Sequence, residues 1–242
     1  MLFERRAYTL RPGNAERFWE LQRKWNTPAQ IPGLLGRNIG YFLVDAGPAE
    51  QIIHLYRFDS YDDWKTRLFG VYTAERADYF TAARKLLLAQ ENMFLNLAPV
   101  PEINPIWGDG RDWLPGKPFY EGVEDDGSLT VVESSLDFLP GGLPIYWDSY
   151  KQYARSVGQR ASAHLIGCFY TLVGPQHRVL HYRWYRTAAE AQEHQVAQQR
   201  DEHSRRFTDA YQPYVVRSCV ALTRPSPVPW MKSLFAPIDW SQ

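Results

Sequence analysis

The sequence repeats itself at a distance of about half its length, and this repeat constrains the fold more than any other feature. The segment GPAEQIIHLYRF at residues 47–58 returns as GPQHRVLHYRWY at residues 174–185, with a histidine at the same place. Five identities fall within fifteen aligned positions, where about one is expected by chance. The identical pairs are Gly40/Gly167, Phe42/Phe169, Gly47/Gly174, Pro48/Pro175 and His54/His181. The chain is therefore predicted to hold two divergent copies of one unit.

The same comparison predicts the domain boundaries. Further pairs at nearly the same spacing, Trp19/Trp147 and Pro99/Pro225 among them, extend the two copies in both directions. We predict a first domain at residues 1–99 and a second domain at residues 129–225. Residues 100–128, rich in proline, glycine and acidic residues, would form a connector, and residues 226–242 would form a C-terminal tail.

Each copy shows the same succession of strand and helix patterns. In the first copy, residues 2–10 are typical of a strand that ends at a Pro-Gly pair, and residues 14–25 carry apolar side chains at helical spacing. Residues 38–58 are typical of a hairpin, Ser60 with Asp63 resembles a helix-capping box, and residues 92–97 close the unit as a strand. This β-α-β-β-α-β order predicts an α+β, ferredoxin-like unit with helices on one face of its sheet. Two such units leave two bare sheet faces, which we expect to pack against each other.

Composition and charge restrict the partners. The 27 Lys plus Arg residues balance the 27 Asp plus Glu residues, so the chain lacks the basic excess that binding to nucleic acid or an anionic membrane favours. No apolar run is long enough to cross a membrane, and the N-terminal MLFERRAYTL is not typical of a signal peptide. Two cysteines favour a reducing, cytoplasmic location. We expect a cytoplasmic protein with no nucleic-acid or membrane partner, and leave self-association into a homo-oligomer open.

Several segments of the first copy resemble the NIPSNAP family: ERRAYTLRPG, GYFLVDAGP, QIIHLYRFDSYDD and QENMFL. The resemblance covers residues 1–99 and is weaker in the second copy, where Gly-Cys-Phe, Gly-Pro and His-Tyr-Arg-Trp-Tyr segments carry it. It implies the dimeric α/β-barrel fold, in which the sheets of two ferredoxin-like units form one barrel. A tandem copy would form that barrel within one chain. The superfamily includes cofactor-free monooxygenases, isomerases and haem-binding proteins. Some eukaryotic members are mitochondrial, a location that the absence of a transit-peptide pattern here does not favour.

The repeated histidines define the candidate site. Alternate residues of a strand share a face, so His54 lies with Tyr56, and His181 lies with Arg183 and Tyr185. We expect these polar and aromatic sets to line one shared cavity inside the barrel, with the opposite sets facing the helices. The opposite sets are Ile53, Leu55 and Arg57 in the first copy and Leu180, Tyr182 and Trp184 in the second. The candidate catalytic residues are His181 and His54, and the candidate substrate-binding residues are Arg183, Tyr185, Glu4, Arg6, Tyr8 and Tyr56.

Structural roles compete with these assignments. A strand histidine often serves as a buried hydrogen-bonding group, and Glu4 and Arg6 are equally well explained as an ion pair across strands. The sequence contains no CxxC pair, phosphate-binding glycine loop or GxSxG motif, and no His/Cys cluster with metal-ligand spacing. We therefore expect no metal and no required cofactor, with haem ligation by His181 as a weaker alternative.

The predicted function is binding of a small aromatic or polyketide-like molecule, with cofactor-independent proton transfer, isomerisation or oxygenation as the reaction. One of the histidines would act as acid and base, and Arg183 or Arg6 would hold developing negative charge. The alternative is a non-catalytic interaction module with a solid core. A cavity on the order of 300 Å³ or more would favour the pocket, and a core filled by rings such as Tyr56 would favour the module.

Overall fold

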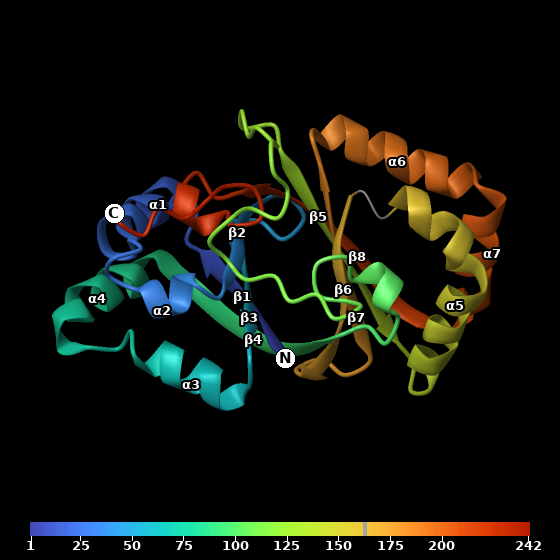
Figure 1. The fold of residues 1–242 in the computed structure, drawn as a ribbon, viewed down its shortest axis with the longest axis horizontal. Helices are drawn as coiled ribbons and strands as arrows, with labels where there is room; N and C mark the ends of the chain where they lie inside the picture. Colours follow the sequence, from blue (N-terminus) through green and yellow to red (C-terminus); the bar gives the residue numbers. More distant parts are fainter. Residues whose placement is uncertain (162–163) are drawn as a thin grey trace. The chain divides into compact units, whose positions relative to one another are not determined.

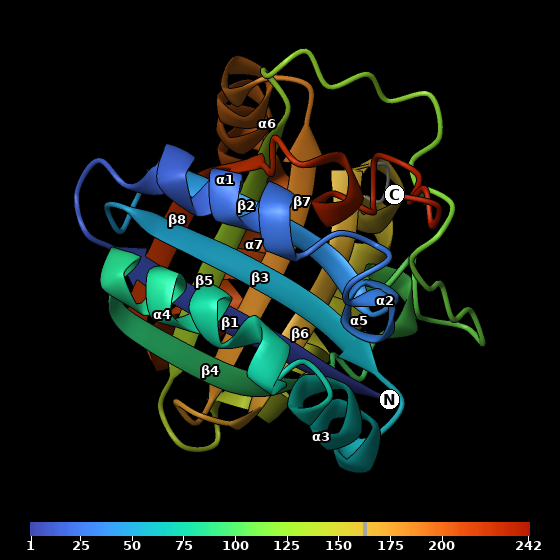
Figure 2. The same ribbon diagram turned by 90° about the vertical axis from the view of Figure 1, so that its left-hand side faces the viewer.

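The computed structural model describes residues 1–161 and 164–242, apart from the side chains of residues 154–161 (Figures 1 and 2). The chain divides into two compact units, each of which combines segments that are distant in the sequence. The first unit comprises residues 1–94, 114–127 and 224–242, and the second comprises residues 95–113 and 128–223. Each unit is built around its own antiparallel sheet.

The first unit has the predicted β-α-β-β-α-β order. Its elements are β1 (Leu2–Leu10), α1 (Ala15–Trp25), α2 (Pro32–Leu35), β2 (Asn38–Ala46), β3 (Gln51–Phe58), α3 (Tyr61–Phe69), the 3₁₀ turn Ala74–Arg76, α4 (Ala77–Leu86) and β4 (Leu87–Leu97). The strands follow the order β4-β1-β3-β2, and α1 and α4 lie across one face of this sheet (Figure 2). On that face, Phe18 and Trp19 of α1 pack with Tyr56 and Phe58 of β3.

The second unit repeats this arrangement. Its elements are the 3₁₀ turn Pro101–Ile103, β5 (Thr130–Phe138), α5 (Gly142–Ala161), β6 (Leu165–Val173), β7 (Arg178–Tyr185), α6 (Ala188–Arg200), α7 (Glu202–Tyr211), the 3₁₀ turn Gln212–Tyr214 and β8 (Val215–Pro225). The strand order is β8-β5-β7-β6, the counterpart of the first sheet. The predicted α+β class, two tandem ferredoxin-like units of the dimeric α/β-barrel type, is confirmed.

The repeated glycines have a structural reason. Gly47 and Gly174 open their Gly-Pro turns at φ values of 138° and 131°, in a region that side chains rarely adopt. A Cβ atom on Gly40 would lie 2.6 Å from the Phe42 ring, and one on Gly167 would lie 2.9 Å from the Phe169 ring. The register of the strand pair shifts beside Gly40 and beside Gly167. The identities therefore mark one irregular hairpin that both units retain.

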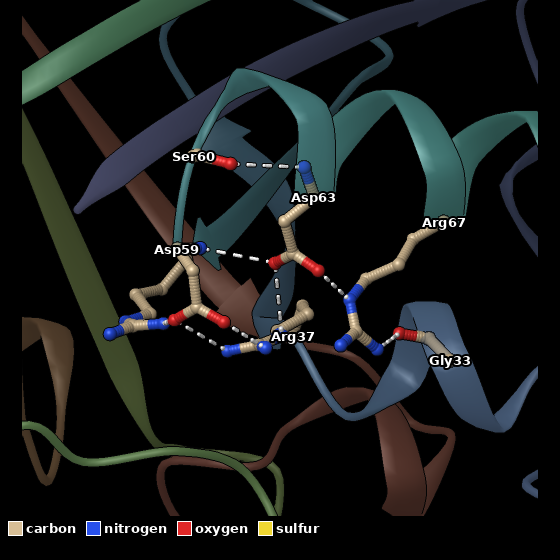
Figure 3. Close-up of polar contacts among 7 residues, drawn as sticks. Gly33, Arg37, Asp59, Ser60, Asp63 and Arg67 are labelled. Atoms are coloured by element: carbon tan, nitrogen blue, oxygen red, sulfur yellow. Dashed lines mark hydrogen bonds and ion pairs between the residues drawn. The ribbon is translucent and has the colours of Figure 1, made fainter.

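The start of α3 confirms the predicted cap at Ser60. The Ser60 hydroxyl accepts a hydrogen bond from the backbone N–H of Asp63 at 3.1 Å, as Figure 3 shows. The Asp63 carboxylate accepts the backbone N–H of Asp59 at 3.0 Å and the Nε–H of Arg67 at 2.5 Å. Asp59 itself pairs with the buried Arg37 at 2.5 Å (Figure 3). The end of β3 and the start of α3 are thus fixed by charge-assisted hydrogen bonds.

The C-terminal segment packs as part of the first unit. It contains the 3₁₀ turn Pro229–Met231, and its residues Val228, Met231 and Leu234 are fully buried. The Nε1–H of Trp230 donates to the carbonyl of Asn26 at 2.8 Å. Trp107 is buried, whereas Trp240 is 44% exposed.

Cys168 lies on β6 and Cys219 lies on β8, at opposite ends of the strand order β8-β5-β7-β6. Both are free thiols, the first buried and the second exposed. Across the described ranges, no helix combines the length and the apolar character that a membrane span requires.

Candidate functional site

Both histidines lie on the helix-covered face of their sheets. The His54 ring on β3 lies 6.1 Å from the Phe18 ring on α1, measured between centroids. The His181 Nε2 atom on β7 lies 2.6 Å from the hydroxyl of Tyr146 on α5. The prediction that these residues turn away from the helices, with Leu180, Tyr182 and Trp184 beneath the helices instead, is therefore wrong for both strands.

The error has a physical cause. A period of two determines which residues share a face, but it does not determine which face the helices cover. Aliphatic side chains such as Ile53 and Leu55 need no polar partner and can be buried against any apolar surface. Beneath the helices, His181 is within reach of the Tyr146 hydroxyl of α5, and the His54 ring stacks on the Tyr41 ring at 3.7 Å between centroids. The polar and aromatic sets therefore occupy the layer between sheet and helices.

The histidines line two different cavities, each formed by residues of its own unit. The cavity that includes His54 has a volume of about 50 Å³ and belongs to the first unit. The cavity that includes His181 has a volume of about 430 Å³ and belongs to the second unit. The prediction of one shared cavity is wrong, and the two units differ greatly in the space they leave open.

Five elements form most of the larger cavity. The sheet contributes His181 and Arg183 from β7, together with side chains of β5 and β8, and the opposite wall comes from α5 and α7. Helices α5 and α7 contribute four aromatic rings to the lining, and most of the polar side chains come from the sheet, α6 and α7. The aromatic lining residues are Tyr146, Tyr150, Phe207 and Tyr211.

His181 is a buried, neutral imidazole in this cavity. Burial, assisted by the positive charge of Arg183, holds the pKa of His181 well below its usual value. Its Nε2 atom contacts the Tyr146 hydroxyl at 2.6 Å and the Cys168 Sγ atom at 3.4 Å. Its Nδ1 atom is buried and has no hydrogen-bond partner among the described residues. The ring thus has one engaged nitrogen and one nitrogen that can exchange a proton.

Arg183 lies two residues beyond His181 on the same face of β7. Its Nε atom is buried without a hydrogen-bond partner, and within the described ranges no carboxylate pairs with its guanidinium. Tyr185, the third predicted residue of this strand, does not line the cavity. Its hydroxyl lies 3.0 Å from the Nδ1 atom of His194 on α6. The structure therefore joins His181 with Arg183 and separates Tyr185 from them.

The residues predicted for the first unit form one compact cluster. Arg6 pairs with Glu4 at 2.7 Å and stacks over the Tyr56 ring at 4.9 Å. The Tyr8 ring lies 4.4 Å from the His54 ring. Glu4 and Arg6 both belong to β1, so the ion pair considered as an alternative exists and runs along one strand. His54 is itself neutral, because burial, followed by the charges of Arg6 and Arg5, holds its pKa well below the usual value.

The comparison with protein families shows to which family the chain belongs. The sequence model of the NIPSNAP family matches the chain twice, at residues 3–101 and at residues 135–229. The chain belongs to the NIPSNAP family. A comparison with curated proteins finds no match.

Several solved structures are similar to this chain. A NIPSNAP protein from Agrobacterium tumefaciens is 30% identical over 40% of this chain and 93% of its own, with a TM-score of 0.38. An anthrone oxidase-like protein covers 93% of this chain and 90% of its own at 10% identity, with a TM-score of 0.60. A candidate monooxygenase from Lactobacillus acidophilus NCFM covers 93% of both chains at 12% identity, with a TM-score of 0.59. At such identities, the last two similarities establish a shared fold only.

The side chains that α5 and α7 contribute to this candidate site were not predicted from the sequence. Tyr146 and Tyr150 are four residues apart on α5, a spacing that places them on one helix face and was available from the sequence. Phe207 and Tyr211 on α7 have the same spacing. What the sequence could not provide was the distance between these helices and the sheet, because that distance depends on packing throughout the unit.

Proposed function

We propose that the second unit of this NIPSNAP protein binds a small, planar aromatic or polyketide-like molecule and removes an acidic proton from it without a cofactor. The observation that carries the proposal is the cavity of about 430 Å³ that His181 and Arg183 line together. Cavities that bind small molecules in proteins span about 300–1,000 Å³. The available volume therefore suits a small ring system.

The walls favour an aromatic ligand. Tyr146, Tyr150, Phe207 and Tyr211 offer ring faces and edges to the cavity. Aromatic rings pair in offset-stacked or edge-to-face geometries that contribute about 0.5–1.5 kcal/mol each beyond the apolar area they bury. A planar ligand can make such contacts on several sides, whereas a flexible aliphatic ligand would lose more conformational entropy on binding.

The two polar side chains of β7, His181 and Arg183, have different roles in the proposed reaction. The neutral His181 accepts the proton from a C–H or O–H bond of the ligand, and the bonding electron pair stays on the ligand as an enolate or phenolate. Arg183 remains charged at every physiological pH and stabilises that anion. The new negative charge also favours the protonated imidazole, which offsets the burial that otherwise keeps the pKa of His181 low. Isomerisation follows when the proton returns to a different atom, and oxygenation follows when the carbanion reacts with O₂.

The first unit supports a different role. Its cavity of about 50 Å³ is too small for a ring system, and Tyr56 and Phe58 are fully buried in its core. This observation favours the alternative function, a non-catalytic interaction module, for the first unit alone. We place the protein in the cytoplasm, a proposal that the two free thiols support.

The test uses anthrone, a planar tricyclic ketone with acidic methylene hydrogens. Purified protein is incubated with anthrone in D₂O without oxygen, and incorporation of deuterium is followed by mass spectrometry, so that proton transfer is measured separately from oxidation. His181→Gln replaces the imidazole with an amide, which can still form a hydrogen bond with Tyr146 but cannot act as the base. We expect it to slow the catalysed exchange about a hundredfold or more, with anthrone affinity nearly unchanged.

The matched control is His203→Gln, which changes an exposed histidine of α7 that does not line the cavity. It should exchange like the wild type. Arg183→Gln should weaken binding of an anionic phenolate analogue more than binding of a neutral ring of the same size. Exchange by His181→Gln at the wild-type rate would refute the assignment of the base, and absence of any catalysed exchange in the wild type would refute the reaction for this compound class.

A further inference from the structure

The small cavity of the first unit is lined by buried polar groups that lack hydrogen-bond partners among the described residues. Both ring nitrogens of His54, the Nε atom of Arg6 and the Nε atom of Arg76 are buried and make no hydrogen bond among the described residues. His54 and Arg6 are 2% and 4% exposed. A buried polar group without a partner typically costs about 1–3 kcal/mol, so several of them around one void indicate a bound species.

The charges around this cavity do not cancel. Arg6 is neutralised by Glu4 at 2.7 Å, whereas Arg76 bonds only to neutral groups. Its Nη1–H donates to the carbonyl of Trp25 at 2.5 Å, and its Nη2–H donates to the side-chain oxygen of Asn26. Two guanidinium groups thus line the cavity, and none of its described lining residues is a carboxylate.

The tyrosines of this cavity do not supply the missing charge. Burial is the main cause that raises the pKa of Tyr8 to about 12 and the pKa of Tyr41 well above its usual value. Their phenols therefore stay protonated near neutral pH. His54 is neutral as well, since its pKa is lowered. The positive charge of Arg76 therefore has no counter-charge among the described residues that line the cavity.

Water molecules in this cavity could form hydrogen bonds with its polar groups but could not neutralise its positive charge. By the measure used for buried waters, one water needs about 10–15 Å³, so a cavity of about 50 Å³ admits a few atoms of that size. Water would meet the donors but would leave the positive charge without a counter-charge in a medium of low dielectric constant. A small anion meets both requirements.

We propose that the first unit binds a small monovalent anion, of the size of chloride, nitrate or formate, between Arg6, His54 and Arg76. The ligand accepts the free N–H groups of the two arginines and neutralises Arg76. The site does not depend on the reaction proposed for the second unit, because all of its residues belong to the first unit.

The direct test is a crystal of the full chain grown in bromide, with data collected at the bromine absorption edge. An anomalous peak inside the cavity, within about 3.5 Å of the arginine Nε atoms, is the expected result. Ordinary water density without an anomalous peak would overturn the proposal. This experiment uses the wild-type chain and therefore does not depend on the folding of any variant.

The second test compares thermal unfolding in sodium chloride and in sodium gluconate at equal ionic strength. Gluconate is too large for the cavity, so chloride should raise Tm in a saturable way and gluconate should not. Val71→Ile adds a methyl group to the cavity lining without changing charge, and Arg76→Gln removes the unpaired charge. Each should raise the half-saturating chloride concentration at least tenfold, whereas Arg23→Gln, on the exposed side of α1, should leave it unchanged. Equal stabilisation by both salts, or an unchanged chloride response in Val71→Ile, would contradict the site.

Discussion

Glu4→Gln should destabilise the first unit strongly, because it breaks a buried ion pair while leaving the cation in place. The Glu4 side chain is fully buried, and its partner Arg6 is 5% exposed. The carboxylate holds the Arg6 guanidinium at 2.7 Å and accepts the side-chain amide of Asn92 at 2.9 Å. Glutamine has nearly the same volume, so the substitution removes the charge and creates no cavity.

The structure sets the size of the effect. Arg6 cannot lose its proton, and the partners that remain, the ring face of Tyr56 at 4.9 Å and the Tyr8 side chain, carry no negative charge. Removal of one partner from a buried pair typically costs about 3–5 kcal/mol, because the other charge stays desolvated and uncompensated. For a chain of this size, 1 kcal/mol lowers Tm by about 2–4 °C, so Glu4→Gln should lower it by about 6–20 °C.

An exposed ion pair of the same length provides the control. Glu16 and Arg23 of α1 lie 2.8 Å apart, but their side chains are 67% and 41% exposed. Exposed pairs contribute about 0–1 kcal/mol, so Glu16→Gln should change the free energy of unfolding very little. Urea denaturation followed by circular dichroism, with the wild type and both variants under identical conditions, measures the two differences.

The double variant Glu4→Gln/Arg6→Gln separates burial of charge from loss of contacts. Without the cation, no uncompensated charge remains, and the double variant should be more stable than Glu4→Gln alone. The reasoning fails if Glu4→Gln and Glu16→Gln have equal effects. It also fails if the free energy of unfolding of the double variant falls by the sum of the decreases measured for Glu4→Gln and Arg6→Gln alone.

Three further predictions follow from other parts of the chain. Iodoacetamide should modify Cys219 in the native protein and reach the buried Cys168 only after denaturation, which peptide mass spectrometry can verify. Removal of residues 227–242 should lower Tm by several degrees, because three apolar side chains of this segment are fully buried. Hydrogen bonds from Arg178 are the main cause that lowers the pKa of Asp137. The stabilisation by Asp137, measured against Asp137→Asn, should therefore be complete above about pH 4 and decline as the pH falls toward the lowered pKa; a constant difference down to pH 2 would contradict the pairing.

Local features of the fold could be predicted from the sequence because their causes are local. The cap of α3 at Ser60 depends on residues within four positions of it, and the irregular hairpins depend on a glycine beside a phenylalanine ring. Because the chain is duplicated, the two units also share the same strand register. Arg6 lies opposite His54, and Ser134 at the equivalent position lies opposite His181. The side of the sheet that the helices cover is a property of the whole unit, and the alternation within one strand does not contain it.

The difference between the two cavities can be traced to individual substitutions between the copies. Around His54 the sheet presents Tyr8, Tyr41 and Tyr56, and the register places Leu136, Cys168 and Arg183 at the equivalent positions around His181. All three replacements remove a phenol ring from the layer beneath the helices, and two of them, Leu136 and Cys168, put a smaller side chain in its place. A layer that loses this volume without collapsing leaves open space, which agrees with cavities of about 50 Å³ and about 430 Å³.

The same comparison explains why the arginine of the second unit is unpaired. In the first unit the cavity arginine that belongs to the sheet is Arg6, and its carboxylate is Glu4 on the same strand. The equivalent positions on β5 are Ser134 and Val132, so this strand has lost both charges, while β7 has gained Arg183 without a carboxylate beside it. A charge whose partner is an internal residue contributes to the fold, whereas a charge facing an open cavity is available to a ligand. The first copy thus has the buried Glu4–Arg6 ion pair in its core, whereas the second copy has Arg183, with no carboxylate partner among the described residues, on the same strand face as His181.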